Sequence, residues 1–293
     1  VGFVLNKPID LELTDVLQRH DKEMASAVPQ ADSLTLHVAP VWEVSNAAVR
    51  EEPEALKHWH LQMRDLISFL ERHSDFRVGI TDIALLNWLQ EEDAPLFYRL
   101  KKRFRNDQIQ LVRSTWGTPN FNSCSDEALI RHFLYGYQFT QRHLPADFPV
   151  FLFPADGVRC PKIPQILADA GIQTVVYRNR FPKEQFVRWQ GSDGTRITGH
   201  WLGSGQIVDK LDLSSGALAL STKKQSGLTH ELALLSLSDP SAPELATHFD
   251  ESTALNALRT FPHVQISSLF DYEKQIRAAG PDSNRFRSQF PDF

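Results

Sequence analysis

The segment VFLFPADGVRCPKIPQILADAGIQTVVY, residues 150–177, decides the fold class of this chain. Its two apolar runs, residues 150–154 and 173–177, have the length and composition of buried strands. Between them, residues 164–170 predict a short helix that Gly171 ends in a left-handed cap. A strand, a helix and a second strand in this order predict two parallel strands joined by a helical crossover.

The same alternation of strands and helices continues on both sides of this segment. Apolar runs predict further strands over residues 33–42, 76–81, 109–116, 230–236 and 264–266. Helical spacing predicts helices over residues 53–73, 83–89, 95–104, 127–142, 243–258 and 268–278. Residues 187–202 predict an antiparallel hairpin that turns at 191–194, and residues 214–228 predict a mobile loop.

The size and composition favour one large domain. The chain has 293 residues, of which 42% are hydrophobic and 10% aromatic, enough for a substantial core. Barrels of repeated strand and helix units commonly reach this length as one unit. We therefore predict an N-terminal extension over residues 1–32, an α/β barrel domain over 33–279 and a C-terminal tail over 280–293.

Charge and hydropathy narrow the classes of partner. The formal net charge is -5 and the pI is about 6.1, so the chain lacks the basic surface that nucleic acid or an anionic membrane would require. It contains no run of eighteen apolar residues, and its two cysteines are too few for a disulfide framework. A neutral or small polar ligand fits this composition better than nucleic acid or an anionic membrane does.

Several blocks, in order, resemble the N-terminal domain of glycoside hydrolase family 38, the α-mannosidase family. They are SCSDEALIRHFLYGYQFTQRHL (123–144), the strand and PQIL helix of 150–180, the hairpin of 186–202, and the strand and helix pairs of 232–258 and 261–276. In that family a helix of the type ESLIRHLLYG precedes a strand that ends in an Asp-containing active-site loop. The resemblance spans roughly residues 33–278 and implies an irregular (β/α) barrel of the family 38/57 glycoside hydrolase and deacetylase type.

The resemblance also implies a zinc site, and this chain departs from it. The family binds zinc through a His-x-Asp pair on the first strand, the nucleophilic Asp and a later His. Here the first strand reads LHVAPVWEVS, and the pair falls on Val41, Trp42, Glu43 or Ser45. Only Glu43 among these could bind a cation through oxygen. We therefore expect no metal site and no cofactor, with zinc possible only if substitute residues rebuild the site.

The resemblance also implies two catalytic carboxyl groups, and neither family position carries a carboxyl group in this chain. Retaining hydrolysis needs two carboxyl groups that flank the scissile bond. The nucleophile position falls on Ala155, and Asp156, one residue later, is the candidate nucleophile, although a turn at Asp156 is an equal alternative. Residues 120–122, which follow Trp116, occupy the acid region without a carboxyl group, so Glu43 is the second catalytic candidate.

Aromatic residues and histidines near strand ends supply the candidate substrate contacts. Trp42 and Trp116 lie where barrel sites form, and an aromatic face can pack on a pyranose ring. His200 is a candidate polar contact, and His200 and His230 are also the candidate late metal ligands. Core packing is the alternative for each of these residues.

Two hypotheses of different class follow. One is an α-mannosidase-like glycoside hydrolase domain of carbohydrate metabolism whose site uses Asp156 and Glu43. The other is a non-catalytic relative that binds carbohydrate or a protein partner on the same barrel. Convergence of Glu43, Asp156 and His200 around one cleft would favour the first hypothesis. The metal-pair, nucleophile and acid positions of the family are changed in three separate blocks, and this favours the second hypothesis for the chemistry of the chain. The order of the blocks favours descent from the family.

Overall fold

A computed structural model describes residues 35–44, 52–145, 148–154, 162–178, 186–202, 206–209, 230–237, 240–256 and 263–278. The N-terminal extension predicted over 1–32, the loop predicted over 214–228, the tail predicted over 280–293 and Asp156 lie outside the described residues.

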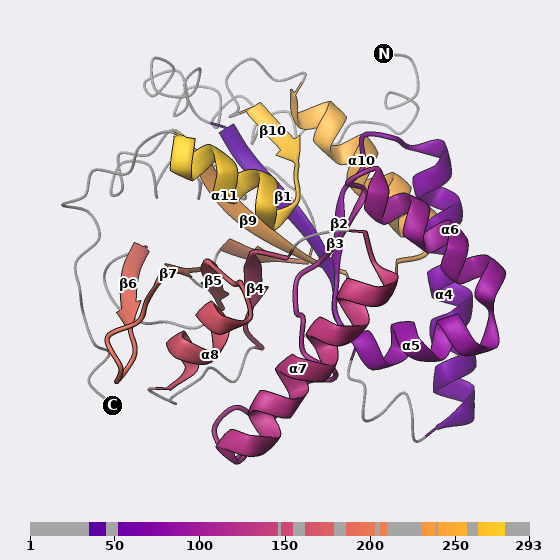
Figure 1. Ribbon diagram of the computed structural model, residues 1–293. Coiled ribbons are helices and arrows are strands. Elements are labelled where there is room, and N and C mark those ends of the chain that lie inside the picture. Colours follow the sequence, from indigo (N-terminus) through magenta and orange to yellow (C-terminus); the bar gives the residue numbers. More distant parts are fainter. Residues whose placement is uncertain are drawn as a thin grey trace, which may run out of the picture.

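Parallel strands form the larger sheet, with β1 at its centre (Figure 1). The order is β3 (Ile109–Leu111), β2 (Val78–Ile80), β1 (Thr35–Trp42), β9 (His230–Leu237) and β8 (Ile207–Val208), and β10 (His263–Ile266) also pairs with β1. Every pairing in this sheet is parallel. Strand β1 is buried along almost its whole length, as a central parallel strand covered on both faces should be.

A second sheet continues from the edge of the first. Its order is β4 (Val150–Leu152), β5 (Thr174–Tyr177), β7 (Arg196–Trp201) and β6 (Phe186–Gln190), with only the β6 and β7 pair antiparallel. The amide of Leu152 donates to the carbonyl of Val112, just past β3, at 2.7 Å, and so joins the two sheets. This bond brings the carboxyl ends of β3 and β4 together.

Alternate side chains of β1 enter two different cores, because successive residues of a strand point to opposite faces. Leu36, Val38 and Trp42 lie in the core beneath the helices on one side of the sheet. Ala39 and Val41 lie in a second core with residues from β4, β5 and β9. His37 and Glu43 belong to this second face of β1, since they share the odd positions of the strand.

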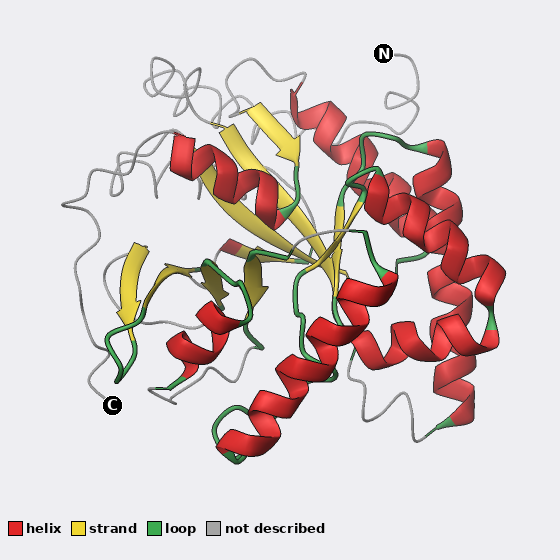
Figure 2. Cartoon of the chain, in the orientation of Figure 1, coloured by secondary structure: helices red, strands yellow, loops and turns green. Residues whose placement is uncertain are grey.

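Helices cover both sides of the sheets (Figure 2). On one side α4 (Pro53–Arg72) contacts α6 (Ala94–Arg105) and α10 (Ala242–Asn256), and α5 (Ile83–Glu92) contacts both α6 and α7 (Asp126–His143). On the other side α11 (Leu269–Ala278) packs on β9 and β4, and α8 (Ile163–Asp169) contacts β7. The apolar stripe predicted for α4 is confirmed, since Trp59, Met63, Leu66 and Leu70 are buried.

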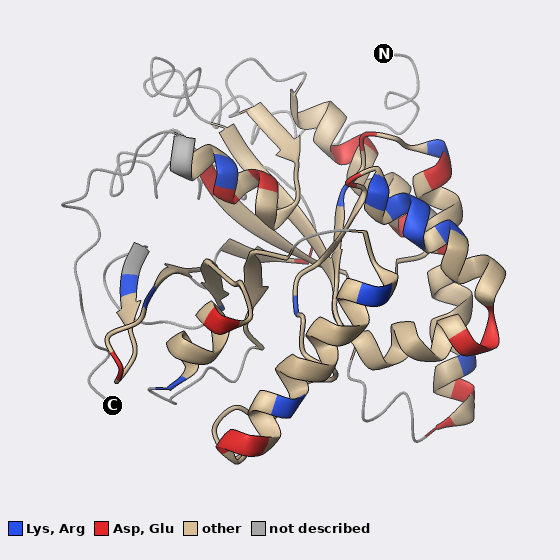
Figure 3. Cartoon of the chain, viewed as in Figure 1, with Lys and Arg blue, Asp and Glu red and all other residues tan. Residues whose placement is uncertain are grey.

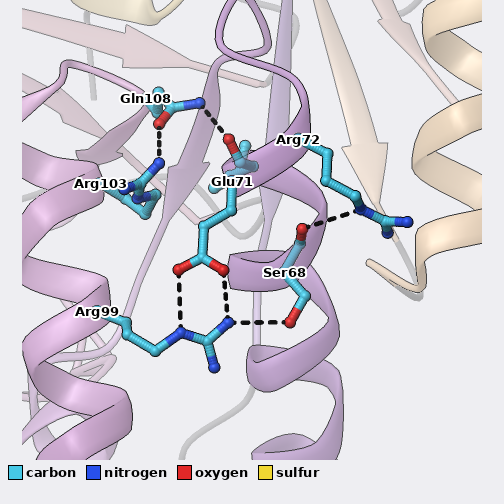
Figure 4. A network of polar contacts seen from close by, with 7 residues as sticks. Ser68, Glu71, Arg72, Arg99, Arg103 and Gln108 are labelled. Carbon is cyan, nitrogen blue, oxygen red and sulfur yellow. Dashed lines mark hydrogen bonds and ion pairs between the residues drawn. The ribbon is translucent and has the colours of Figure 1, made fainter.

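A polar network fastens α4 to α6 (Figure 4). Arg99 on α6 donates to both carboxylate oxygens of Glu71 on α4, at 3.0 and 2.7 Å, and also to the hydroxyl of Ser68. Gln108, just before β3, donates to the carbonyl of Leu70 and accepts from Arg103. The basic residues at the end of α6 form the concentration of blue in Figure 3, and their position suits the negative end of the helix dipole.

The sequence predicted most of these elements. The cap at Gly171 is confirmed by its φ of 79°, and the hairpin of β6 and β7 turns as predicted, with Gly194 at a φ of 88°. Ser125 caps α7 by accepting a hydrogen bond from the amide of Ala128. The prediction for residues 109–116 was too long, because the chain leaves the strand after Leu111.

Among the described residues no helix is both long and apolar enough to span a lipid bilayer. The mixed α/β class and the parallel sheet predicted from the sequence are confirmed.

Candidate functional site

Charged side chains gather at the carboxyl ends of the parallel strands. Glu43 follows β1, Asp82 follows β2, Arg113 follows β3 and Arg178 follows β5. This edge is where α/β barrels and open parallel sheets place their ligands. Glu43 is in direct contact with both Arg113 and Arg178, and these three residues are called the strand-end cluster.

Glu43 bridges the two arginines. One carboxylate oxygen, Oε1, pairs with Nη2 of Arg113, and the other, Oε2, pairs with Nη1 of Arg178. The side chain of Arg113 is 3% exposed and that of Arg178 10% exposed, whereas Glu43 is 24% exposed. The carboxylate is therefore the member of the cluster that a ligand can reach most easily.

Arg113 is held by contacts on three sides. Besides Glu43, its Nε donates to the carbonyl of Leu152 at 3.2 Å and its Nη1 donates to the hydroxyl of Thr118 at 3.3 Å. Burial lowers the pKa of Arg113, and Glu43 opposes this shift. An arginine keeps its charge in proteins, so the cluster contains two permanent cations.

Asp82 supplies a second negative charge near Arg113. Its carboxylate is buried, accepts a hydrogen bond from the amide of Leu85 at 3.1 Å and acts on Arg113 electrostatically. Its backbone is left-handed, with a φ of 78°, a conformation that is uncommon outside glycine. With Asp82 included, two carboxylates balance two guanidinium groups.

This arrangement does not fit a divalent cation. Both oxygens of Glu43 already accept from arginines. At about 5 Å and an effective dielectric constant of about 20, the two guanidinium groups would together repel a divalent ion by about 13 kcal/mol, which offsets the attraction of one coordinating carboxylate at about 2.5 Å. The balanced charges therefore offer a cation no net attraction. Among the residues that the structure describes, no group of three or more His, Cys, Asp or Glu side chains could hold a metal ion.

The other predicted site residues have their described contacts with residues outside the strand-end cluster. Trp42 is buried in the helix-side core, where its ring stacks on Trp59 at 6.1 Å. Trp116 is half-buried and packs its ring edgewise against Tyr135 and Phe139. Asp156 lies outside the described residues, so its place relative to Glu43 stays a prediction.

His200 joins a second polar set, the histidine group of His37, His230, His200 and Tyr272. Nδ1 of His37 lies 2.9 Å from the hydroxyl of Ser267, and its Nε2 lies 3.0 Å from Nδ1 of His230. The rings of His37 and His200 both pack on Tyr272, at 5.4 and 5.3 Å. His200 and His230, the candidate late ligands, are thus linked through Tyr272 and His37.

Burial lowers the pKa of each of these three histidines. It lowers the pKa of His200 to about 3, and burial together with His230 lowers that of His37 to about 4, although Asp271 acts in the opposite direction. Burial, followed by the charge of Glu231, raises the pKa of Tyr272 well above its usual value. His37 and His200 are therefore uncharged at neutral pH, and within this layer His37 is hydrogen-bonded to Ser267 and His230.

We expect this layer to make the protein sensitive to acid. The pKa of His37 is about 4 when folded and 6.5 when unfolded, so the unfolded chain binds a proton more readily between these values. The contribution of His37 to the free energy of unfolding is complete above pH 6.5 and falls by about 3 kcal/mol as the pH drops toward 4. Urea unfolding of the wild type and of His37→Gln at several pH values measures this loss.

The variant's stability at pH 8 gives the cost of altered packing, and a shallower pH dependence below that point gives the contribution of His37. Equal slopes for the two proteins would contradict the assignment.

Sequence reasoning missed Arg113 and Arg178. Each is the first charged residue after an apolar strand, in LVR and VVYR, and each lies at a carboxyl end. Their position could have identified them from the sequence, because an arginine at the carboxyl end of a buried parallel strand lies at the edge where ligand sites form.

Comparison with known protein families identifies a matching family. The model of the glycosyl hydrolases family 38 N-terminal domain matches residues 42–292. Alpha-mannosidase G of Dictyostelium discoideum is 20% identical over 279 residues, covering 92% of this chain and 25% of that protein. The chain thus spans about a quarter of the length of this relative.

Solved structures share the fold. An alpha-mannosidase from Enterococcus faecalis V583 superimposes with a TM-score of 0.67 at 13% identity, covering 85% of this chain and 30% of that one. A putative polysaccharide deacetylase from Mycobacterium smegmatis superimposes with a TM-score of 0.59 at 10% identity, covering 89% of this chain and 96% of that one. These likenesses agree with the barrel type predicted from the sequence.

Proposed function

The chain belongs to glycosyl hydrolase family 38, whose N-terminal domain model matches residues 42–292, and on this premise we propose that it binds neutral carbohydrate at its strand ends without hydrolysing mannosides. The observation that carries the proposal is the strand-end cluster, in which Glu43 is bound to two buried arginines. It lies where the family resemblance puts the first-strand metal ligands.

The chemistry of the cluster suits sugar hydroxyl groups. A carboxylate accepts hydrogen bonds from hydroxyls, and a guanidinium donates to their oxygens in a fixed fork. Because the charges of Glu43, Asp82, Arg113 and Arg178 balance, a neutral ligand meets no net charge there. Trp116, which is half-buried, is our candidate aromatic contact, and the alpha-mannosidase relatives support a carbohydrate ligand.

Hydrolysis would require more than this cluster supplies. A retaining mechanism needs a free carboxylate nucleophile and a carboxyl group that donates a proton. Glu43 is engaged with both arginines, and Asn120 and Asn122 in the acid region carry no acidic proton. Asp156 is the remaining candidate nucleophile.

The proposal is tested by measuring binding and turnover on the same sample. We expect calorimetry to detect binding of an α-mannoside or a related neutral glycoside, and a chromogenic α-mannoside to release no chromophore. Glu43→Gln, assayed where circular dichroism shows that it is folded, should weaken binding at least about tenfold, the scale of one lost charged hydrogen bond.

Glu127→Gln is the matched control, because Glu127 pairs with Arg131 on the exposed face of α7. Turnover that disappears in Asp156→Asn would replace this proposal with a rebuilt hydrolase. Absence of binding to any neutral glycan would refute it.

A further inference from the structure

Two guanidinium groups are fixed at the point where the family resemblance places a cation. Arg113 comes from the end of β3 and Arg178 from the end of β5, and both side chains are at least nine-tenths buried. Arg113 is also anchored to Leu152 and Thr118, so its position does not depend on Glu43 alone. The charges are therefore permanent and held by the scaffold.

The two arginines bind Glu43 as a bridging cation would bind a carboxylate. Each oxygen of Glu43 has its own positive partner, one from β3 and one from β5. The carboxylate consequently links three strands of two sheets at their carboxyl ends. A cation that bound Glu43 would have to share its two oxygens with both arginines, and neither arginine can lose its charge.

We infer that Arg113 and Arg178 act as a built-in cation at this site, fixing Glu43 and offering N–H donors to the ligand, so that carbohydrate binding is independent of divalent metal. This deepens the proposed function and rests on it for the class of ligand. Two arginines in place of a metal ion change the geometry of the contact with the ligand as well as the charge. A metal ion accepts lone pairs without regard to a plane, whereas a guanidinium donates N–H groups in its own plane.

The test combines metal content with ligand binding on the intact chain. Protein from cells grown with added zinc should contain well below one zinc ion per chain by elemental analysis. Calorimetric titration with Zn²⁺, Mn²⁺ and Ca²⁺ should show no stoichiometric binding, and none of the ions should raise the melting temperature. Stoichiometric zinc that raises the melting temperature would overturn the inference.

Chelation separates this inference from the proposed function. We expect the dissociation constant for the glycoside to be the same with and without EDTA. Binding that EDTA abolishes and zinc restores would overturn the built-in cation while leaving carbohydrate binding in place. If no glycoside binds in either condition, the proposed function fails, and the metal titration on the same sample still decides whether the arginines exclude a cation.

Discussion

Replacing Glu43 with Gln should lower the free energy of unfolding by about 3 to 5 kcal/mol, the cost of leaving buried charges without their partner. Gln preserves the shape of the side chain but removes the negative charge between Arg113 and Arg178, which are 3% and 10% exposed. Neither guanidinium can become neutral to relieve the repulsion. Urea unfolding at neutral pH measures the loss.

The same substitution at Glu127 provides the control. Glu127 and Arg131 form an exposed pair one helical turn apart, with 69% and 59% of their side chains accessible. Such pairs contribute about 0.5 kcal/mol or less. A loss below about 1 kcal/mol at Glu43 would mean that water or other groups satisfy the arginines, and would weaken both proposals for this site.

Replacing Gly136 with Val should destabilise the protein by about 3 kcal/mol or more, at or above the upper end for overpacking a core. Gly136 lies on the buried face of α7, in the RHFLYG motif that carries part of the family resemblance. A Cβ atom there would lie 2.0 Å from the carbonyl oxygen of Ser114 and 3.1 Å from Cδ1 of Ile83. The first of these is a backbone atom, so α7 itself would have to move.

Gln138→Val on the same helix is the matched control, because Gln138 is exposed. It introduces the same β-branched residue, and only the lower helix propensity of Val should count, about 0.5 kcal/mol. Thermal unfolding of both variants checks the difference. If the two variants unfold at the same temperature, the close approach of α7 to Ser114 is not a constraint on stability.

Local patterns in the sequence were sufficient to predict most elements. The helix of residues 164–170 and its cap at Gly171 followed from short-range rules, and the structure has α8 at Ile163–Asp169. The buried stripe of α4 followed from helical spacing, because one face of a helix repeats about every 3.6 residues. These features depend on neighbours within a few positions.

The site was only partly predictable. Glu43 was singled out because it is the one residue near the aligned metal positions that carries a carboxylate. Trp42, one residue earlier, was proposed as a sugar contact, and the structure places it in the core on the opposite face of β1. Which face of a fully buried parallel strand meets the ligand edge cannot be read from apolar composition, since both faces are apolar.

The sequence by itself therefore determined the class of fold, the order of its elements and the family, since all three depend on local periodicity and on the order of short motifs. Only the tertiary structure decided the partners of Glu43. Arg113 is 70 positions away in the chain, and β3 and β5 belong to different sheets. Their ends meet because the two sheets join at Val112 and Leu152, and a long-range contact of this kind leaves no periodic signal in the sequence.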